Sequence, residues 1–206
     1  MVGKIPAISL DGHDLRVLAH LSHELMARHD LTPLTQGKLD CLCGLYSIIN
    51  AVRLLRQPIA PLSYPASRRL FEAGTDLLHK NGWLDAALVD GMVIRRWKSL
   101  AALITAQAST NTHTMSVETP MIPNGKLSAA AIERWIVEGL ADGMPVLMHL
   151  GQRHQHYTVV AGIDRQHISL FDSWGLVRIK RAGFVMRQDI TSNCLMRFKL
   201  LHRIQP

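Results

Sequence analysis

The chain has 206 residues, of which 48% are hydrophobic and 19% are charged, and its formal net charge at neutral pH is +7. This size is sufficient for one folded domain with a substantial core. Two classes of protein are excluded, because no apolar run reaches the roughly 18 residues of a membrane-spanning helix and three cysteines do not make a disulfide framework.

The first half of the sequence predicts helices. Apolar residues recur there at helical spacing, and turn residues separate the periodic segments. A loop over 30–39, marked by Pro33 and Gly37, separates the first two helices. The predicted helices cover residues 14–29, 43 to just before Pro58, 67–80, 84–89 and 91–108.

The second half of the sequence predicts a sheet. Short β-branched or apolar runs alternate with turns from about residue 112 onward. A turn at 123–125 and a helix over 129–141, capped by Ser128 and ended by Asp142-Gly143, interrupt them. The predicted strands cover residues 114–119, 145–150, 156–163, 167–171, 176–180 and 194–201. Such closely spaced strands favour an antiparallel meander.

Helices followed by strands indicate an α+β fold. We predict a single domain over 1–206, with a mostly helical lobe over about 1–110 and a mostly antiparallel sheet lobe over about 111–206. The helix that starts near Cys43 is expected to lie against the sheet, in an active-site cleft between the two lobes.

The Cys43 helix carries the first candidate for chemistry. Its apolar residues recur at helical spacing: Leu45, Ile48, Ile49, Val52 and Leu55. One face of this helix should therefore be buried in the core. A thiol in the first turn faces unpaired backbone N–H groups and the positive end of the helix dipole, and both favour the thiolate. The pattern indicates a nucleophile on a fixed helix.

A cysteine nucleophile needs a nearby base and a group that orients this base. His156 starts one predicted strand, and Asp172 ends the next one. In an antiparallel hairpin these two positions are neighbours. The carboxylate of Asp172 could then accept a hydrogen bond from one imidazole nitrogen and leave the other to face the thiol, as in a Cys-His-Asp triad.

Three segments together resemble a known family. They are Cys43-Gly-Leu-Tyr-Ser on an apolar helix, His156-Tyr-Thr-Val-Val-Ala-Gly-Ile-Asp, and Phe171-Asp-Ser-Trp-Gly. In this order they are similar to motifs of the papain-like cysteine peptidase superfamily, and most similar to its bacteriocin-processing branch. The resemblance covers the chain from about Gln36 to Gly175.

The resemblance implies a papain-like fold and assigns a role to each matching residue. Cys43 matches the nucleophile, His156 the general base and acid, and Asp172 the carboxylate that orients the imidazole. Gln36 matches the side chain that lines the oxyanion hole, where the backbone N–H of Cys43 would be the second donor.

Each candidate also has a simpler interpretation. Cys43 could be an inert core cysteine, and Cys41 could be the nucleophile in its place. Asp172 could be a turn former, as we expect for Asp164. Gln36 could be a solvated loop residue.

The chain has eleven histidines, so other residues compete with His156 for the role of the base. His154 lies two residues before His156 and would point to the same side if the strand began early. We expect His149, His154 and His167 at the surface or in loops. Trp174 could cover the Asp–His pair or fill part of the core.

The sequence predicts a thiol hydrolase that cleaves a peptide or isopeptide bond through a thioester intermediate. Its partner would be a protein or peptide substrate, and it would need no cofactor. We expect no metal, since Cys-x-Cys lacks a second ligand pair at finger spacing. The alternatives are a glutamine deamidase or transglutaminase-type effector on the same scaffold, and a catalytically silent module that binds peptides or nucleic acid. The oligomeric state is not predicted.

Charge and the N-terminus bear on partners and location. The charge of +7 permits nucleic acid as a partner, but the basic residues are scattered and do not alternate with aromatic residues. Residues 1–10 carry a single lysine, and charged residues interrupt the apolar ones that follow, unlike a signal peptide. We therefore expect a cytoplasmic protein with no membrane partner, although export by a dedicated secretion system would leave no mark in the sequence.

Overall fold

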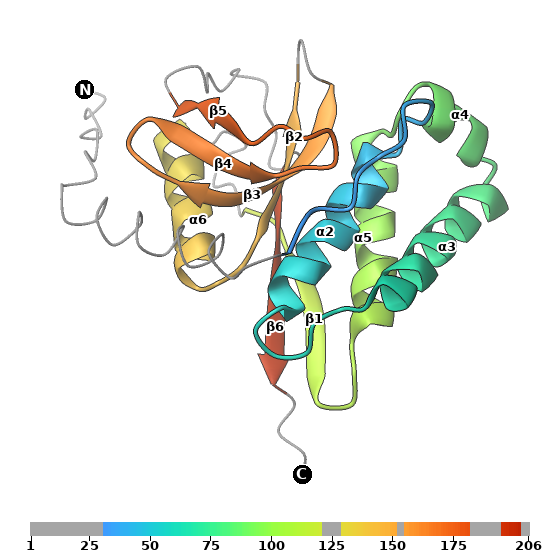
Figure 1. Ribbon diagram of the computed structural model, residues 1–206, viewed down its shortest axis with the longest axis horizontal. Helices are drawn as coiled ribbons and strands as arrows, with labels where there is room; N and C mark the ends of the chain where they lie inside the picture. Colours follow the sequence, from blue (N-terminus) through green and yellow to red (C-terminus); the bar gives the residue numbers. More distant parts are fainter. Residues whose placement is uncertain (1–30, 121–128, 152–154, 182–194, 203–206) are drawn as a thin grey trace, which may run out of the picture.

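The computed structural model describes residues 31–120, 129–151, 155–181 and 195–202. Its architecture is α+β, with helices first along the chain and an antiparallel sheet after them (Figure 1). Some predicted features lie outside the described residues: the helix over 14–29, the turn at 123–125, the cap at Ser128, His154 and Cys194.

The helices follow the predicted pattern, with differences at two starts. Helix α3 begins three residues earlier than predicted, because Ser63 accepts a hydrogen bond from the N–H of Ala66 and Pro65 suits the first turn. Helix α5 begins three residues later, since Gly91 adopts a φ of 81° that no α-helix contains. The helices are α2 (Cys43–Arg56), α3 (Tyr64–Lys80), α4 (Leu84–Val89), α5 (Ile94–Ala108) and α6 (Ala129–Ala141). Within the described residues, none has the length and apolar character needed to cross a membrane.

The sheet is antiparallel throughout, with strand order β1-β6-β2-β3-β4-β5. The predicted meander is confirmed for β2 to β5, but it is wrong for the last strand. Strand β6 does not follow β5; it pairs with both β1 and β2, and thereby satisfies the hydrogen-bonding groups on one edge of each. The strands are β1 (His113–Glu118), β2 (Val146–Leu150), β3 (His156–Ile163), β4 (His167–Phe171), β5 (Arg178–Lys180) and β6 (Leu195–His202).

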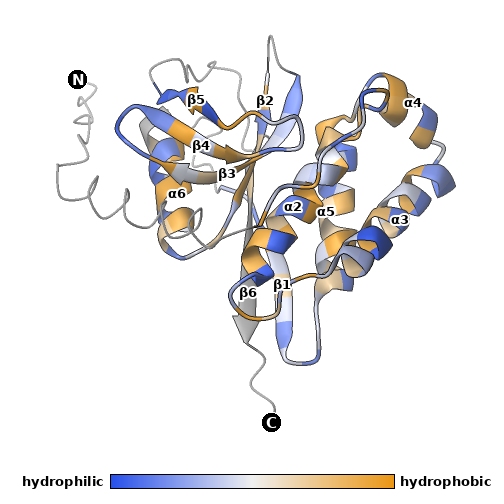
Figure 2. Cartoon of the chain, in the orientation of Figure 1, coloured by the Kyte–Doolittle hydropathy of each residue, from blue (hydrophilic) through white to orange (hydrophobic). Residues whose placement is uncertain are grey.

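The two faces of the sheet are covered by different helices. Figure 1 shows α2 to α5 on one side of the sheet and α6 on the other. Tyr157 and Val159 of β3 share a buried cluster with α2, α3 and α5, whereas Val160 belongs to a second cluster with α6. Figure 2 shows hydrophilic residues along the outer side of α3, away from this core.

Helix α2 is the central element of the larger cluster. Leu45, Ile48 and Ile49 have no exposed surface, as their helical spacing predicted. Helix α2 also packs directly against β3. The start of α2, with Cys43, is thus held next to the strand that begins at His156.

Candidate active site

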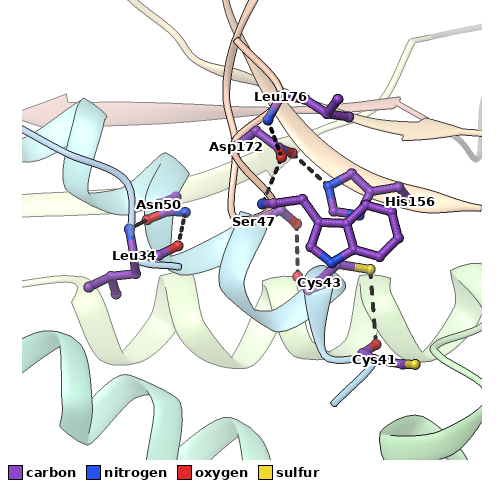
Figure 3. Close-up of polar contacts among 10 residues, drawn as sticks. Leu34, Cys41, Cys43, Ser47, Asn50, His156, Asp172 and Leu176 are labelled. Atoms are coloured by element: carbon purple, nitrogen blue, oxygen red, sulfur yellow. Dashed lines mark hydrogen bonds and ion pairs between the residues drawn. The ribbon is translucent and has the colours of Figure 1, made fainter. Parts of the chain in front are cut away.

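His156 and Asp172 lie side by side, as their positions in the hairpin predicted. Strand β3 begins at His156, and Asp172 follows the last residue of β4. The two strands pair antiparallel, with Val159 opposite Phe171 at the end near the site and a register shift farther along, between Val160 and Gly162. Nε2 of His156 and Oδ2 of Asp172 are 2.6 Å apart, and both side chains are fully buried (Figure 3). The carboxylate therefore fixes the orientation of the ring.

The second carboxylate oxygen of Asp172 is also engaged. Oδ1 accepts hydrogen bonds from the backbone N–H groups of Trp174 and Leu176, at 2.8 and 3.2 Å. Burial alone would raise the pKa of Asp172, but the hydrogen bond from His156, the charge of His156 and the N–H of Trp174 hold it below the ordinary value. Asp172 is thus a turn former and an ionised partner of His156 at once.

Cys43 is the first residue of α2, and only 6% of its surface is exposed. Figure 3 shows its sulfur on the side of the helix that faces His156. Nδ1 of His156 is buried and has no hydrogen-bond partner among the described residues. Burial would lower the pKa of His156, but the hydrogen bond with Asp172 and the proximity of Cys43 and of the Asp172 charge raise it to about 9. This pKa favours the imidazolium at neutral pH, between the carboxylate of Asp172 and the sulfur of Cys43.

The backbone at the start of α2 adds hydrogen-bond donors beside the sulfur. Leu42 precedes the helix and offers no side-chain cap, and the first turn has no acidic residue. The N–H groups of Leu45 and Tyr46 already donate to the carbonyl of Leu42. Those of Cys43 and Gly44 have no acceptor within the described part of the chain. This end of the helix dipole is consequently open to negative charge.

Gln36 is brought to the border of the site by its backbone. Its N–H donates to the carbonyl of Ser173, at 3.0 Å, directly after Asp172. Its side chain is half-buried: Nε2 donates to the carbonyl of Asp40, and Oε1 is buried without a partner among the described residues. The backbone of Gln36 thus lies next to the candidate triad, and its amide donor is bound to its own loop.

Cys41 faces a different group from Cys43. Its sulfur lies 3.3 Å from the carbonyl of Val89, and its N–H donates to the carbonyl of Leu88. These contacts attach Cys41 to the end of α4. His156 therefore lies beside Cys43, whereas Cys41 contacts the end of α4.

Trp174 covers the imidazole of His156. The two rings are stacked, with centroids 4.6 Å apart and an angle of 10° between their planes. More than half of the Trp174 surface, 58%, is exposed. Trp174 therefore shields one face of the His156 ring, and the alternative prediction that it fills the core is wrong.

The other candidate residues have structural surroundings of their own. Asp164 accepts hydrogen bonds from the N–H groups of Gln166 and His167, as predicted for a turn former. His149 was expected in a loop or at the surface, but it lies in β2, half-buried, with its ring 4.6 Å from that of Tyr157. Burial and the charge of His156 lower the pKa of His149. The strand over 145–150 was predicted, but the partial burial of His149 was missed, because it depends on the contact with Tyr157 of the neighbouring strand.

Among the described residues, no three His, Cys, Asp or Glu side chains are grouped so that they could hold a metal ion. Comparisons with protein-family models, curated proteins and solved structures found no match to this chain. The function is therefore argued from the geometry of the site alone.

Proposed function

We propose that this protein is a papain-like thiol hydrolase that cleaves a peptide or isopeptide bond. One observation carries the proposal: a buried imidazole binds a carboxylate through Nε2, while its Nδ1 is left for the thiol of Cys43. A buried structural histidine normally has both nitrogens hydrogen-bonded. A nitrogen without a fixed partner, next to a thiol on a helix start, is what a general base requires.

The proposed reaction has two halves. Cys43 transfers its thiol proton to His156, and the resulting thiolate attacks the carbonyl carbon of the amide. The imidazolium of His156 then gives this proton to the leaving amine as the C–N bond breaks. A thioester between Cys43 and the acyl group remains. Water then attacks this thioester while His156 accepts the proton of the water, and the thiolate leaves with the imidazolium restored. Asp172 stays ionised and keeps Nε2 in place through both halves.

Negative charge develops on the carbonyl oxygen in each half, and donors at the start of α2 would stabilise it. One donor is the N–H of Cys43, which has no acceptor among the described residues and belongs to the same residue as the reacting sulfur. The side-chain amide of Gln36 would be the second donor once it exchanges the carbonyl of Asp40 for the substrate. Preorganised donors of this kind contribute a factor of about 10² to 10³ in rate each.

Alkylation of the chain by iodoacetamide at neutral pH, with residue-level mapping by mass spectrometry, tests the nucleophile. We expect the label on Cys43, its loss in Cys43→Ala and its persistence in Cys41→Ala, the matched control. A label that follows Cys41, or an unchanged rate in His156→Gln, would contradict the assignment. His156→Gln is the informative variant because glutamine keeps an N–H donor for Asp172 but is no base.

A second experiment tests the bond that is broken. A set of unstructured peptides is incubated with the wild type and with Cys43→Ala, and the masses of the products are measured by mass spectrometry. Cleavage that depends on Cys43 supports the peptidase. Conversion of glutamine to glutamate without cleavage would show that the same residues act on a side-chain amide instead.

A further inference from the structure

The residues that follow Cys43 and His156 meet in the core. Gly44 comes after Cys43 in α2, and Tyr157 comes after His156 in β3. A Cβ atom at Gly44 would lie 3.4 Å from Cδ2 of Tyr157 and 3.2 Å from Cδ1 of Trp97. The backbone of α2 therefore lies so close to both rings that even a Cβ atom at position 44 would be a tight fit and would require a neighbour to shift by a few tenths of an ångström.

Two hydrogen bonds lock this contact. Nε1 of Trp97 donates to the carbonyl of Gly44, at 3.2 Å, and the hydroxyl of Tyr157 donates to the carbonyl of Met92, at 2.6 Å. The two rings are tilted, with centroids 4.5 Å apart, and both side chains are almost completely buried. Aromatic pairs have preferred geometries and stabilise a fold beyond the area that they bury, and a densely packed core leaves them little room to move.

We propose that Trp97 and Tyr157 are positioning residues that set the distance between the thiol of Cys43 and the imidazole of His156. The inference rests on the proposed function, because the distance between these two groups matters only if they act together in a reaction. The two reacting groups come from a helix and a strand that are far apart in the sequence. Cys43 directly precedes Gly44, which lies close to both rings, and His156 directly precedes Tyr157. The side-chain torsions of Cys43 and His156 are therefore the main freedom that the two groups keep. A misplacement of about 1 Å costs on the order of 100-fold in rate.

Tyr157→Phe is the mildest test, since it keeps the ring and removes only the hydroxyl that holds Met92. The measurement is the alkylation rate of Cys43 by iodoacetamide as a function of pH, together with a thermal melt. At about pH 6 we expect a rate about tenfold below the wild type, because alkylation then depends on the neighbouring imidazole as a base. At about pH 10 the rates should converge, since hydroxide in the solvent can then act as the base in place of His156.

This pH profile separates positioning from loss of structure. A loosened fold would expose Cys43 and speed alkylation at every pH, whereas a displaced imidazole slows it only at low pH. Tyr46→Phe is the matched control, because it removes a hydroxyl from α2 where the ring contacts Phe71 and not β3. Its profile should match the wild type. Trp97→Phe, which loses the bond to the Gly44 carbonyl, should repeat the slowing of Tyr157→Phe at low pH.

A double-mutant cycle with His156→Gln decides whether Tyr157 acts through the imidazole. If it does, Tyr157→Phe slows alkylation at low pH in the wild type and has no further effect in His156→Gln. An unchanged rate in Tyr157→Phe, or an equal slowing in both backgrounds, overturns the positioning role and leaves the proposed function standing. If His156→Gln alone reacts as fast as the wild type, the proposed function itself fails, and this inference fails with it.

Discussion

Helices α2 and α3 begin in opposite ways. At the start of α3, the hydroxyl of Ser63 accepts a hydrogen bond from the N–H of Ala66, and Pro65 has no N–H to satisfy. At the start of α2, Leu42 provides no cap, and the N–H groups of Cys43 and Gly44 lack acceptors among the described residues. One helix start is closed by its own side chains, and the other is open beside a sulfur.

The two helix starts show that α2 and α3 are stabilised by different interactions. A side-chain cap contributes about 0.5–2 kcal/mol, which α3 gains and α2 forgoes. Helix α2 instead buries Leu45, Ile48 and Ile49 completely, and each such side chain contributes roughly 1.5–3 kcal/mol. Because its core face holds it in place, α2 tolerates free donors in its first turn. The open start is thus compatible with a stable fold and available for an anionic sulfur or a substrate oxygen.

Loss of the proposed base, His156, should give the largest effect on activity. His156→Gln keeps a donor for Asp172 but cannot transfer protons, so turnover of a peptide substrate should fall by a factor of about 10² to 10⁴. Steady-state kinetics measure this loss, with a urea melt to confirm folding. Turnover within a few-fold of the wild type would mean that the open start of α2 has no catalytic use.

Asp172→Asn should cost both activity and stability. Oδ1 accepts from two backbone N–H groups and Oδ2 from His156, so both oxygens act as acceptors. An asparagine has one acceptor oxygen and would turn its NH₂ group toward one of these donors. We expect slower alkylation of Cys43 at neutral pH and a loss of about 1–3 kcal/mol in the free energy of unfolding. A variant as stable as the wild type would show that the carboxylate is dispensable.

The stability contributed by the pair should depend on pH in a defined way. The pKa of His156 is raised to about 9, so its contribution is complete below the unfolded value near 6.5 and is lost as the pH rises to about 9. The pKa of Asp172 is lowered, so its contribution is lost in acid, as the pH falls below the ordinary aspartate value. Urea melts of the wild type and His156→Gln across this range should converge above about pH 9. Parallel curves would contradict the raised pKa.

Much of the site followed from local sequence patterns. The bounds of β3 and β4 are set by turn residues on both sides, and an antiparallel hairpin then brings His156 to Asp172. Helix α2 ends at Arg56, before the Pro58 that predicted its end. These features depend on short stretches of chain, whose spacing can be read directly.

The features that were missed depend on long-range contacts. Strand β6 lies between β1 and β2 because its partners are distant in the sequence, and no local pattern encodes that order. The meeting of Trp97 and Tyr157 at Gly44 likewise joins three elements. In the sequence, Gly44 was only part of the Cys43-Gly-Leu-Tyr-Ser motif. The structure explains the glycine by the close approach of α2 to the rings of Trp97 and Tyr157.

The cap of α3 gives a smaller and purely structural prediction. Ser63→Ala removes the acceptor for the N–H of Ala66 and should lower the free energy of unfolding by about 1 kcal/mol. The alkylation rate of Cys43 should stay at the wild-type value, because Ser63 takes no part in the site. A urea melt and the same labelling assay measure the two quantities on one sample. If the labelling rate changed with the melt, the two helix starts would not be independent.

The smallest effect on stability is expected at His149. This residue tests whether a titratable group outside the proposed triad influences the site. Burial and the charge of His156 lower its pKa below the ordinary histidine value near 6.5. The unfolded chain therefore binds a proton that the folded protein resists, and this residue makes stability fall as the pH drops below about 6.5. His149→Phe keeps a ring against Tyr157 and removes the proton site, so its stability should fall less than that of the wild type between about pH 7 and pH 5.

His79→Asn, a substitution at an exposed position of α3, is the control and should follow the wild type. Alkylation of Cys43 at neutral pH should be unchanged in both, since His149 is then neutral; a slower rate in His149→Phe would make His149 a fourth member of the site.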